Sequence, residues 1–179
     1  MNSIEKPVEN EQHQYLTFYI AGEEYAVSIL RVREILEYDT VTRLPSTPPA
    51  IRGVINLRGR VVPVIDLARK FGLPESPVTK TTCTVIVEVG EGESQTVMGV
   101  MTDLVSQVVE LQPDEIEPPP AFGTRIHLEF LKGLGRADKK FVLMLDIDKV
   151  LSTDELAVAY SHADAGASPT AVSGAEATP

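Results

Sequence analysis

The 179-residue sequence contains no tryptophan and a single cysteine, Cys83. One cysteine excludes an intrachain disulfide and leaves no cysteine pair for a zinc site. No apolar stretch approaches the roughly 18 residues that suggest a membrane-spanning helix. Basic residues are also in the minority, with 16 Lys and Arg against 26 Asp and Glu and a formal net charge of −10. Because such a charge repels phosphate backbones, a nucleic acid is not an expected partner.

Residues that could form an active site are scattered along the chain. The three histidines, His13, His127 and His162, fall in a polar leader, a loop near prolines and an alanine-rich tail, without the spacing of a metal site. Cys83 lies in a strand-like run, where a small buried side chain is a better interpretation than a nucleophile. No phosphate-binding loop or complete dinucleotide-binding motif occurs. The sequence therefore predicts a protein that is not an enzyme and has no metal ion or cofactor.

The two ends of the chain differ in composition from its middle. Residues 1–13 are polar and lack the apolar run of a signal peptide, so we expect a flexible leader and a cytoplasmic location. Residues 157–179 are rich in Ala, Ser, Thr and Pro and have few large apolar side chains, which is typical of disorder. The folded part is expected to span residues 14–156, and 43% hydrophobic residues are enough to build its core.

Short runs rich in Val, Ile, Thr, Tyr and Phe have the length of strands and are separated by turn-forming residues. These runs are residues 16–20, 25–29, 61–67, 82–89, 96–101 and 141–147. They predict a mostly β fold built from hairpins. Pro63 cannot donate a ladder hydrogen bond, so its strand is expected at a sheet edge or a bulge.

Two segments are expected to be helical. Ile29, Val32, Ile35 and Leu36 follow a helical spacing that places Glu34 on the opposite face. Residues 148–156, after the last strand, are expected to form a short C-terminal helix.

Part of the sequence is repeated. Residues 51–54 and 61–67 resemble residues 131–134 and 141–147, and the strands of both copies end in an aspartate, Asp66 or Asp146. These aspartates suit turn or helix caps better than an acid–base pair. We expect two copies of one β-module, residues 14–75 and 80–150, packed together as two barrels because each is too small for a core of its own. The alternative is a chance likeness between hairpins rich in Val and Ile.

Seven of the nine arginines lie between residues 31 and 70. Most of them are expected on turns and strand exteriors, where charge is common. Arg58 differs because it stands at an expected hairpin tip beside Gly59. There its forked side chain could pair with a carboxylate on another protein, and arginine is enriched at interface hot spots.

Residues 51–67, IRGVINLRGRVVPVIDL, resemble the signature of CheW-like chemotaxis coupling proteins, with its Gly, Asn-Leu-Arg-Gly, Pro and final Asp-Leu. The similarity covers about residues 15–156, including residues 22–25, 32–35 and 131–135. It implies an all-β fold of two small intertwined five-stranded barrels of the SH3 or OB kind, with short helices. It also implies a non-enzymatic adaptor that links the cytoplasmic tips of methyl-accepting chemoreceptors to the regulatory domain of the histidine kinase CheA.

The resemblance further implies two contact surfaces. The positions that match the receptor-binding groove between the barrels are Val32, Glu34, Leu57, Arg58 and Val108. The positions expected to contact the kinase are Thr42, Arg43, Leu44, Val62 and Val64. For Val32, Leu57 and Val108, plain core packing is the alternative. We expect a monomer in dilute solution that joins receptor arrays at the inner membrane.

Other functions are alternatives to this one. Coupling proteins of this kind also serve twitching and other chemosensory-like pathways, and the sequence does not choose among them. A hybrid with a receiver domain is not expected, because the chain ends soon after the adaptor module. A barrel that binds nucleic acid or oligosaccharide would need surface aromatics and a basic strip, whereas aromatics make up 6% of this chain.

Overall fold

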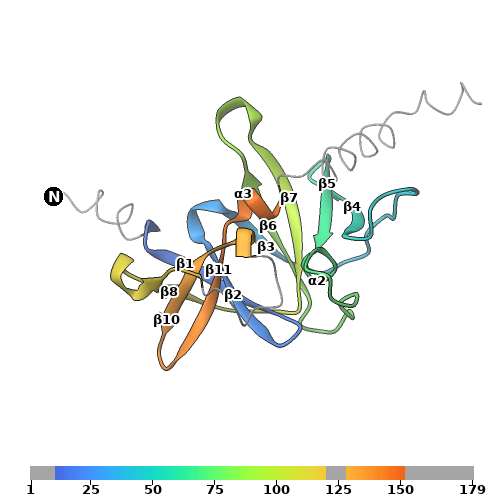
Figure 1. Cartoon of the computed structure of the whole chain (residues 1–179). Coiled ribbons are helices and arrows are strands. Elements are labelled where there is room, and N and C mark those ends of the chain that lie inside the picture. Colours follow the sequence, from blue (N-terminus) through green and yellow to red (C-terminus); the bar gives the residue numbers. More distant parts are fainter. Residues whose placement is uncertain (1–10, 120–127, 152–179) are drawn as a thin grey trace, which may run out of the picture.

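The computed structural model describes residues 11–119 and 128–151, and it is built mainly from strands (Figure 1). The strands are β1 Gln14–Ile20, β2 Glu23–Ser28, β3 Val32–Glu37, β4 Ile51–Leu57, β5 Arg60–Asp66, β6 Cys83–Val89, β7 Thr96–Thr102, β8 Leu104–Glu110, β9 Ile116–Glu117, β10 Leu131–Ala137 and β11 Lys140–Leu145. The helical turns are short: η1 Ile29–Arg31, α2 Leu67–Lys70, η2 Gly92–Ser94, η3 Pro113–Glu115, η4 Leu128–Phe130 and α3 Ile147–Val150. The predicted β fold with short helices is confirmed. The expected disordered tail and most of the expected leader lie outside the described residues.

The strands form two mixed sheets with the orders β8-β1-β2-β11-β10-β9 and β3-β6-β7-β5-β4. Each sheet takes strands from both copies of the repeat. In the six-stranded sheet, β1 and β2 of the first copy lie beside β8 and β11 of the second. In the five-stranded sheet, β3 and β5 of the first copy lie beside β6 and β7 of the second. The links between copies include the two parallel pairs, β2 with β11 and β5 with β7. The first sheet has six strands rather than the expected five because the two-residue β9 adds to β10.

Both sheets roll up so that their edge strands approach each other. In the six-stranded sheet, Val109 of edge strand β8 and Ile116 of edge strand β9 pack against the same small core cluster, around Val142 and Met144. In the five-stranded sheet, edge strands β3 and β4 line one cavity, and Glu34 of β3 bonds to Arg58 just after β4. This rolling agrees with the expected small barrels.

A larger core lies between the two sheets. Leu16, Phe18 and Val27 of β1 and β2 belong to one buried cluster with side chains of β6 and β7, such as Val85 and Val100. The opposite face of β1 and β2 belongs to the smaller cluster, so these strands serve two cores at once. Burial of this apolar surface is the main force that holds the two copies together.

The two repeated aspartates cap helical turns, as predicted. The Asp66 carboxylate accepts a hydrogen bond from the Ala68 N–H at 3.0 Å and opens α2. The Asp146 carboxylate accepts one from the Lys149 N–H at 3.4 Å and opens α3. No helix in the described ranges is long and apolar enough to span a membrane.

The helix predicted around residues 29–36 is wrong. Only Ile29–Arg31 form a helical turn, and Val32–Glu37 form strand β3, in which half-buried and exposed residues alternate. The pairing of β3 with β6 shifts register between Val32 and Glu34, so the apolar residues of this strand do not alternate regularly and their spacing resembles that of a helix. The neighbouring β6 supplies the hydrogen-bond partners of the strand. The expected C-terminal helix is present only as α3, and the rest of its predicted span, residues 152–156, is outside the described residues.

Pro63 does not mark an edge strand, because β5 lies between β7 and β4, but the predicted alternative of a bulge is present next to it, where the β4–β5 pairing shifts register opposite Val64 and Ile65. No ladder bond is lost there. Val54, which lies opposite Pro63, uses its backbone N–H and C=O to bond to Thr42 rather than to β5. The backbone nitrogen of Pro63 therefore points away from β4. On the other side, the pairing with β7 begins only at Val64.

Candidate functional site

Arg58 is held at the tip of the β4–β5 hairpin by a two-residue turn. Arg58 and Gly59 have φ angles of 52° and 86°. Positive φ at both positions suits the twist of a tight hairpin, and glycine adopts it without steric cost. The Asn56 side chain also accepts a hydrogen bond from the Gly59 N–H at 2.7 Å. The turn leaves 71% of the Arg58 side chain exposed.

The guanidinium of Arg58 binds the carboxylate of Glu34 through two parallel hydrogen bonds. Arg58 Nη1 donates to Oε1 at 2.5 Å and Nη2 donates to Oε2 at 2.9 Å. These hydrogen bonds lower the pKa of Glu34 and raise the pKa of Arg58, so both groups stay charged. The bidentate geometry fixes the direction of both side chains more firmly than a single contact would.

A small cavity of about 160 Å³ lies beside this ion pair. Side chains from all five strands of the sheet line it: Arg33, Glu34, Leu57, Arg58, Arg60, Val62, Ile86 and Val97. Leu57 is half-buried, while Val62 and Ile86 are buried. The site is therefore a charged rim above an apolar floor, which is the usual composition of a protein–protein contact. It brings together three of the predicted receptor-binding residues.

The other two predicted receptor-binding residues lie at the junction of the sheets. Val32 is half-buried on β3 and packs against the larger core. Val108 lies on edge strand β8, is 50% exposed and pairs with Leu16. Because opposite residues of an antiparallel pair share a face, Val108 borders the larger core to which Leu16 belongs. Neither valine lines the Arg58 cavity.

The predicted kinase-contact residues fall into an exposed group and a buried group. Thr42 exchanges two backbone hydrogen bonds with Val54, at 2.9 and 2.8 Å, so residues 42–44 run along the outer side of β4. Thr42 and Arg43 are exposed and Leu44 is half-buried. Val62 and Val64 of β5 are 3% and 0% exposed, and Val62 lines the cavity beside Arg58.

A network of charges anchors the segment that contains Arg43. Arg43 Nη2 lies 3.1 Å from Glu75 Oε1, and the same oxygen accepts from Arg52 Nη1 at 2.5 Å. Hydrogen bonding to Arg43 and the charge of Arg52 lower the pKa of Glu75. The sequence did not predict this network, because Glu75 lies outside the matched motif.

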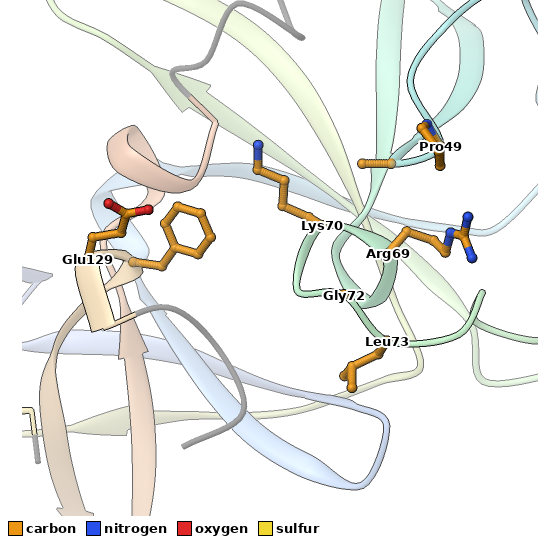
Figure 2. Close-up of a pocket in the computed structure, with 8 residues that line it drawn as sticks. Pro49, Arg69, Lys70, Gly72, Leu73 and Glu129 are labelled. Atoms are coloured by element: carbon orange, nitrogen blue, oxygen red, sulfur yellow. The ribbon is translucent and has the colours of Figure 1, made fainter. Parts of the chain in front are cut away.

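Two larger cavities flank these surfaces. One, of about 510 Å³, lies between β3 and β4 and includes Thr42 in its lining. The other, of about 480 Å³, lies between α2 and η4, and Figure 2 shows Arg69 and Glu129 on opposite sides of it with Lys70 between them. The Lys70 ammonium is 5.9 Å from the centre of the Phe130 ring. None of the residues predicted to bind the receptor or the kinase lines the second cavity.

Comparisons with known proteins agree with this architecture. A family model described as the CheW-like domain matches residues 14–155. The chain is 40% identical over 153 residues to the chemotaxis protein CheW of Klebsiella aerogenes, covering 83% of this chain and 90% of the relative. It is 29% identical over 144 residues to protein FrzA of Myxococcus xanthus, covering 79% and 87% respectively.

A solved structure also has the same fold. The crystal structure of the scaffolding protein TtCheW from Thermoanaerobacter tengcongensis matches with a TM-score of 0.72 and 30% identity. The match covers 80% of this chain and 90% of that one. The family match, the relatives and the shared fold together show that the chain belongs to the CheW-like domain family of non-enzymatic chemotaxis scaffolds.

Proposed function

We propose that this chain is an adaptor that couples methyl-accepting chemoreceptors to the histidine kinase CheA in bacterial chemotaxis. Membership of the CheW-like family supports this function, and the rigid Glu34–Arg58 pair at a barrel edge is the structural observation that carries it. The adaptor works by binding two proteins at once, without a chemical step. It acts in the cytoplasm, where the receptor tips end, and is recruited to receptor arrays at the inner membrane.

The receptor tip binds the surface around Arg58. Two N–H groups of the guanidinium are used by Glu34, which leaves further N–H groups to donate to a receptor side chain or backbone carbonyl. Leu57 of the cavity and Val32 and Val108 at the sheet junction supply apolar contacts for an amphipathic helix. The apolar contacts provide affinity, while the fixed charges set the register of the helix.

The regulatory domain of CheA binds the segment of Thr42, Arg43 and Leu44 on the outer side of β4, while the predicted contacts Val62 and Val64 are buried in the neighbouring β5. The two Thr42–Val54 hydrogen bonds and the Arg43–Glu75 ion pair order this segment before binding. An ordered segment loses less conformational entropy on association than a flexible one. The kinase-binding segment lies beside β4 of one sheet, whereas the receptor-binding surface reaches from the β4–β5 hairpin tip to β8 of the other sheet, so both partners can bind at once.

Isothermal titration calorimetry with a receptor-tip fragment and with the CheA regulatory domain tests this function. We expect the unchanged protein to bind both, and Arg58→Glu to lose receptor binding while it keeps kinase binding. The matched control is Arg136→Glu, which reverses an arginine of similar exposure on β10 that is only 3.8 Å from Glu117. Absence of binding to either partner by the folded, unchanged protein would refute the proposal.

A further inference from the structure

Arg31 joins three segments of the chain at one point. It is the last residue of η1, where the chain crosses from the six-stranded sheet into β3 of the other sheet. Its Nη1 donates to the backbone carbonyls of Glu88 and Gly90, at 3.4 and 3.1 Å, and so holds the end of β6. Its Nη2 donates to Asp148 Oδ2 at 2.6 Å and so holds α3.

Asp148 completes the arrangement with its second oxygen. Asp148 Oδ1 accepts a hydrogen bond from the Gly90 N–H at 2.9 Å. The guanidinium, the carboxylate and the peptide groups of Gly90 therefore form a closed ring of hydrogen bonds. We define Arg31, Asp148 and Gly90 as the clasp. The side chains of Arg31 and Asp148 are 26% and 37% exposed, so the clasp is partly shielded from solvent.

The clasp joins the two sheets. Asp148 follows β11 of the six-stranded sheet, whereas Gly90 follows β6 of the five-stranded one. The Arg31–Asp148 ion pair thus ties a helix that follows one sheet to a strand end of the other.

The clasp also adjoins the proposed receptor-binding surface. Val32 follows Arg31 directly, and Glu34 lies two residues further along β3. The other wall of that surface, Val108, lies on β8 of the six-stranded sheet. The separation of the two walls therefore depends on how the sheets are held against each other.

We propose that Arg31 and Asp148 are positioning residues that set the spacing between β3 and β8 and thereby shape the receptor-binding surface. The expected effect on receptor binding rests on the proposed function, whereas the expected effect on the spacing of β3 and β8 does not. Neither side chain contacts the receptor. The clasp fixes the start of β3 relative to the second copy of the repeat, so the apolar wall of one sheet faces that of the other at a defined distance.

The spacing is measured directly with two spin labels, without any partner. Labels at the exposed positions Glu37 of β3 and Ser106 of β8, in a Cys83→Ser background, report the distance between the walls by pulsed electron resonance. We expect a narrow distance distribution for this background and a broader one for Asp148→Asn. Arg136→Gln, which removes an exposed ion pair far from the clasp, should leave the distribution unchanged. An unchanged distribution in Asp148→Asn would overturn the inference.

Binding provides the second measurement, by calorimetry on the full chain. Asp148→Asn should weaken binding of a receptor-tip fragment by roughly 2- to 30-fold, the range known for residues that act through others. Affinity for the CheA regulatory domain should stay unchanged, because its proposed surface lies within one sheet. Arg31→Lys serves as the second variant, since lysine keeps the charge but lacks the fork that reaches Asp148 and Gly90 together.

The two variants should be non-additive if the clasp acts as one unit. The double variant should then bind the receptor no more weakly than the weaker single variant. Fully additive losses would contradict a shared role. If the unchanged protein does not bind the receptor fragment at all, the proposed function fails, while the spin-label distances still decide whether the clasp positions β3.

Discussion

At the scale of single residues, the most informative contact is the Glu34–Arg58 pair. The two residues are 24 positions apart, and each fixes the direction of the other's charge. A pair this exposed adds little to stability, because solvent screens it and two long side chains must be ordered. We propose that the pair serves recognition, where a fixed charge can select a partner.

The double variant Glu34→Arg/Arg58→Glu separates pairing from recognition. It keeps an ion pair across the same two positions but exchanges the charges that a partner meets. We expect its thermal unfolding midpoint to match that of the unchanged protein, while receptor affinity falls at least roughly tenfold, as for other hot-spot residues. Calorimetry and thermal melts measure the two effects. If the double variant bound the receptor as tightly as the unchanged protein does, the pair would serve only to join the strands.

A second charge, Glu24, is nearly buried, with 8% of its surface exposed. Burial raises the pKa of Glu24, but hydrogen bonds from Lys140, Thr17 and Tyr19 and the charge of Lys140 outweigh it, so the pKa is lowered. The Lys140 ammonium lies 2.8 Å from the carboxylate. Since folding lowers this pKa, the charged form stabilises the fold above the unfolded pKa of about 4.3, and this stabilisation is lost as the pH falls through the folded value.

The variant Glu24→Gln should therefore lose stability in a pH-dependent way. Its free energy of unfolding should lie well below that of the unchanged protein near pH 7, and the gap should narrow below about pH 4. Urea denaturation at pH values between 3 and 7 measures the gap. Glu23→Gln, at the exposed neighbouring position, is the control and should show no such gap. A gap of constant size would mean that the charge of Glu24 is not involved.

At the scale of elements, residues 42–44 depend on a glycine in β4. Gly53 has a φ of 152°, and a Cβ there would collide with the Thr42 carbonyl oxygen. The second copy repeats the device, because a Cβ at Gly133 would collide with the Glu117 carbonyl oxygen. In both copies, glycine lets another segment cross close to the strand.

Gly53→Ala should displace residues 42–44 and weaken binding to the CheA regulatory domain. Because the collision involves backbone atoms, the segment itself must move. Gly22→Ala is the matched control: Gly22 also has a positive φ, of 85°, but open space around it, so only a backbone cost of ~1–2 kcal/mol is expected. Calorimetry with the kinase domain distinguishes the two variants. If Gly53→Ala and Gly22→Ala bound the kinase domain with equal affinity, residues 42–44 would not belong to the kinase-binding surface.

The sequence predicted most strands and both aspartate caps, because alternation, turn residues and capping are local signals. It failed at β3, whose spacing of apolar residues suits a helix until a register shift in the pairing with β6 is taken into account. The Glu34–Arg58 pair and the clasp were also missed. Their partners lie 24 and 117 positions apart, and their contact depends on how the sheets roll and cross.

At the scale of the whole molecule, the two copies of the repeat share their strands. The first copy alone would leave β1 and β2 without β8 and β11, and β5 without β7. The larger core would also be split between the two halves. We therefore expect the two halves to fold as one unit rather than as two domains.

Neither half should fold alone. Fragments 14–75 and 80–151 should each lack dispersed amide signals in NMR spectra, and an equimolar mixture should regain the spectrum of the whole chain. Urea unfolding of the whole chain should be a single transition seen equally by tyrosine fluorescence and circular dichroism. A dispersed spectrum from either fragment alone would contradict this view of the fold.

The Glu34–Arg58 contact has one more consequence, for solubility at high concentration. Edge strands with unpaired backbone groups invite another chain to add to the sheet. In the five-stranded sheet, this ion pair draws the edge strands β3 and β4 towards each other, and Arg33, Glu34 and Glu37 place charge along β3. The contact that we propose for a receptor should thus also discourage copies of the chain from joining edge to edge.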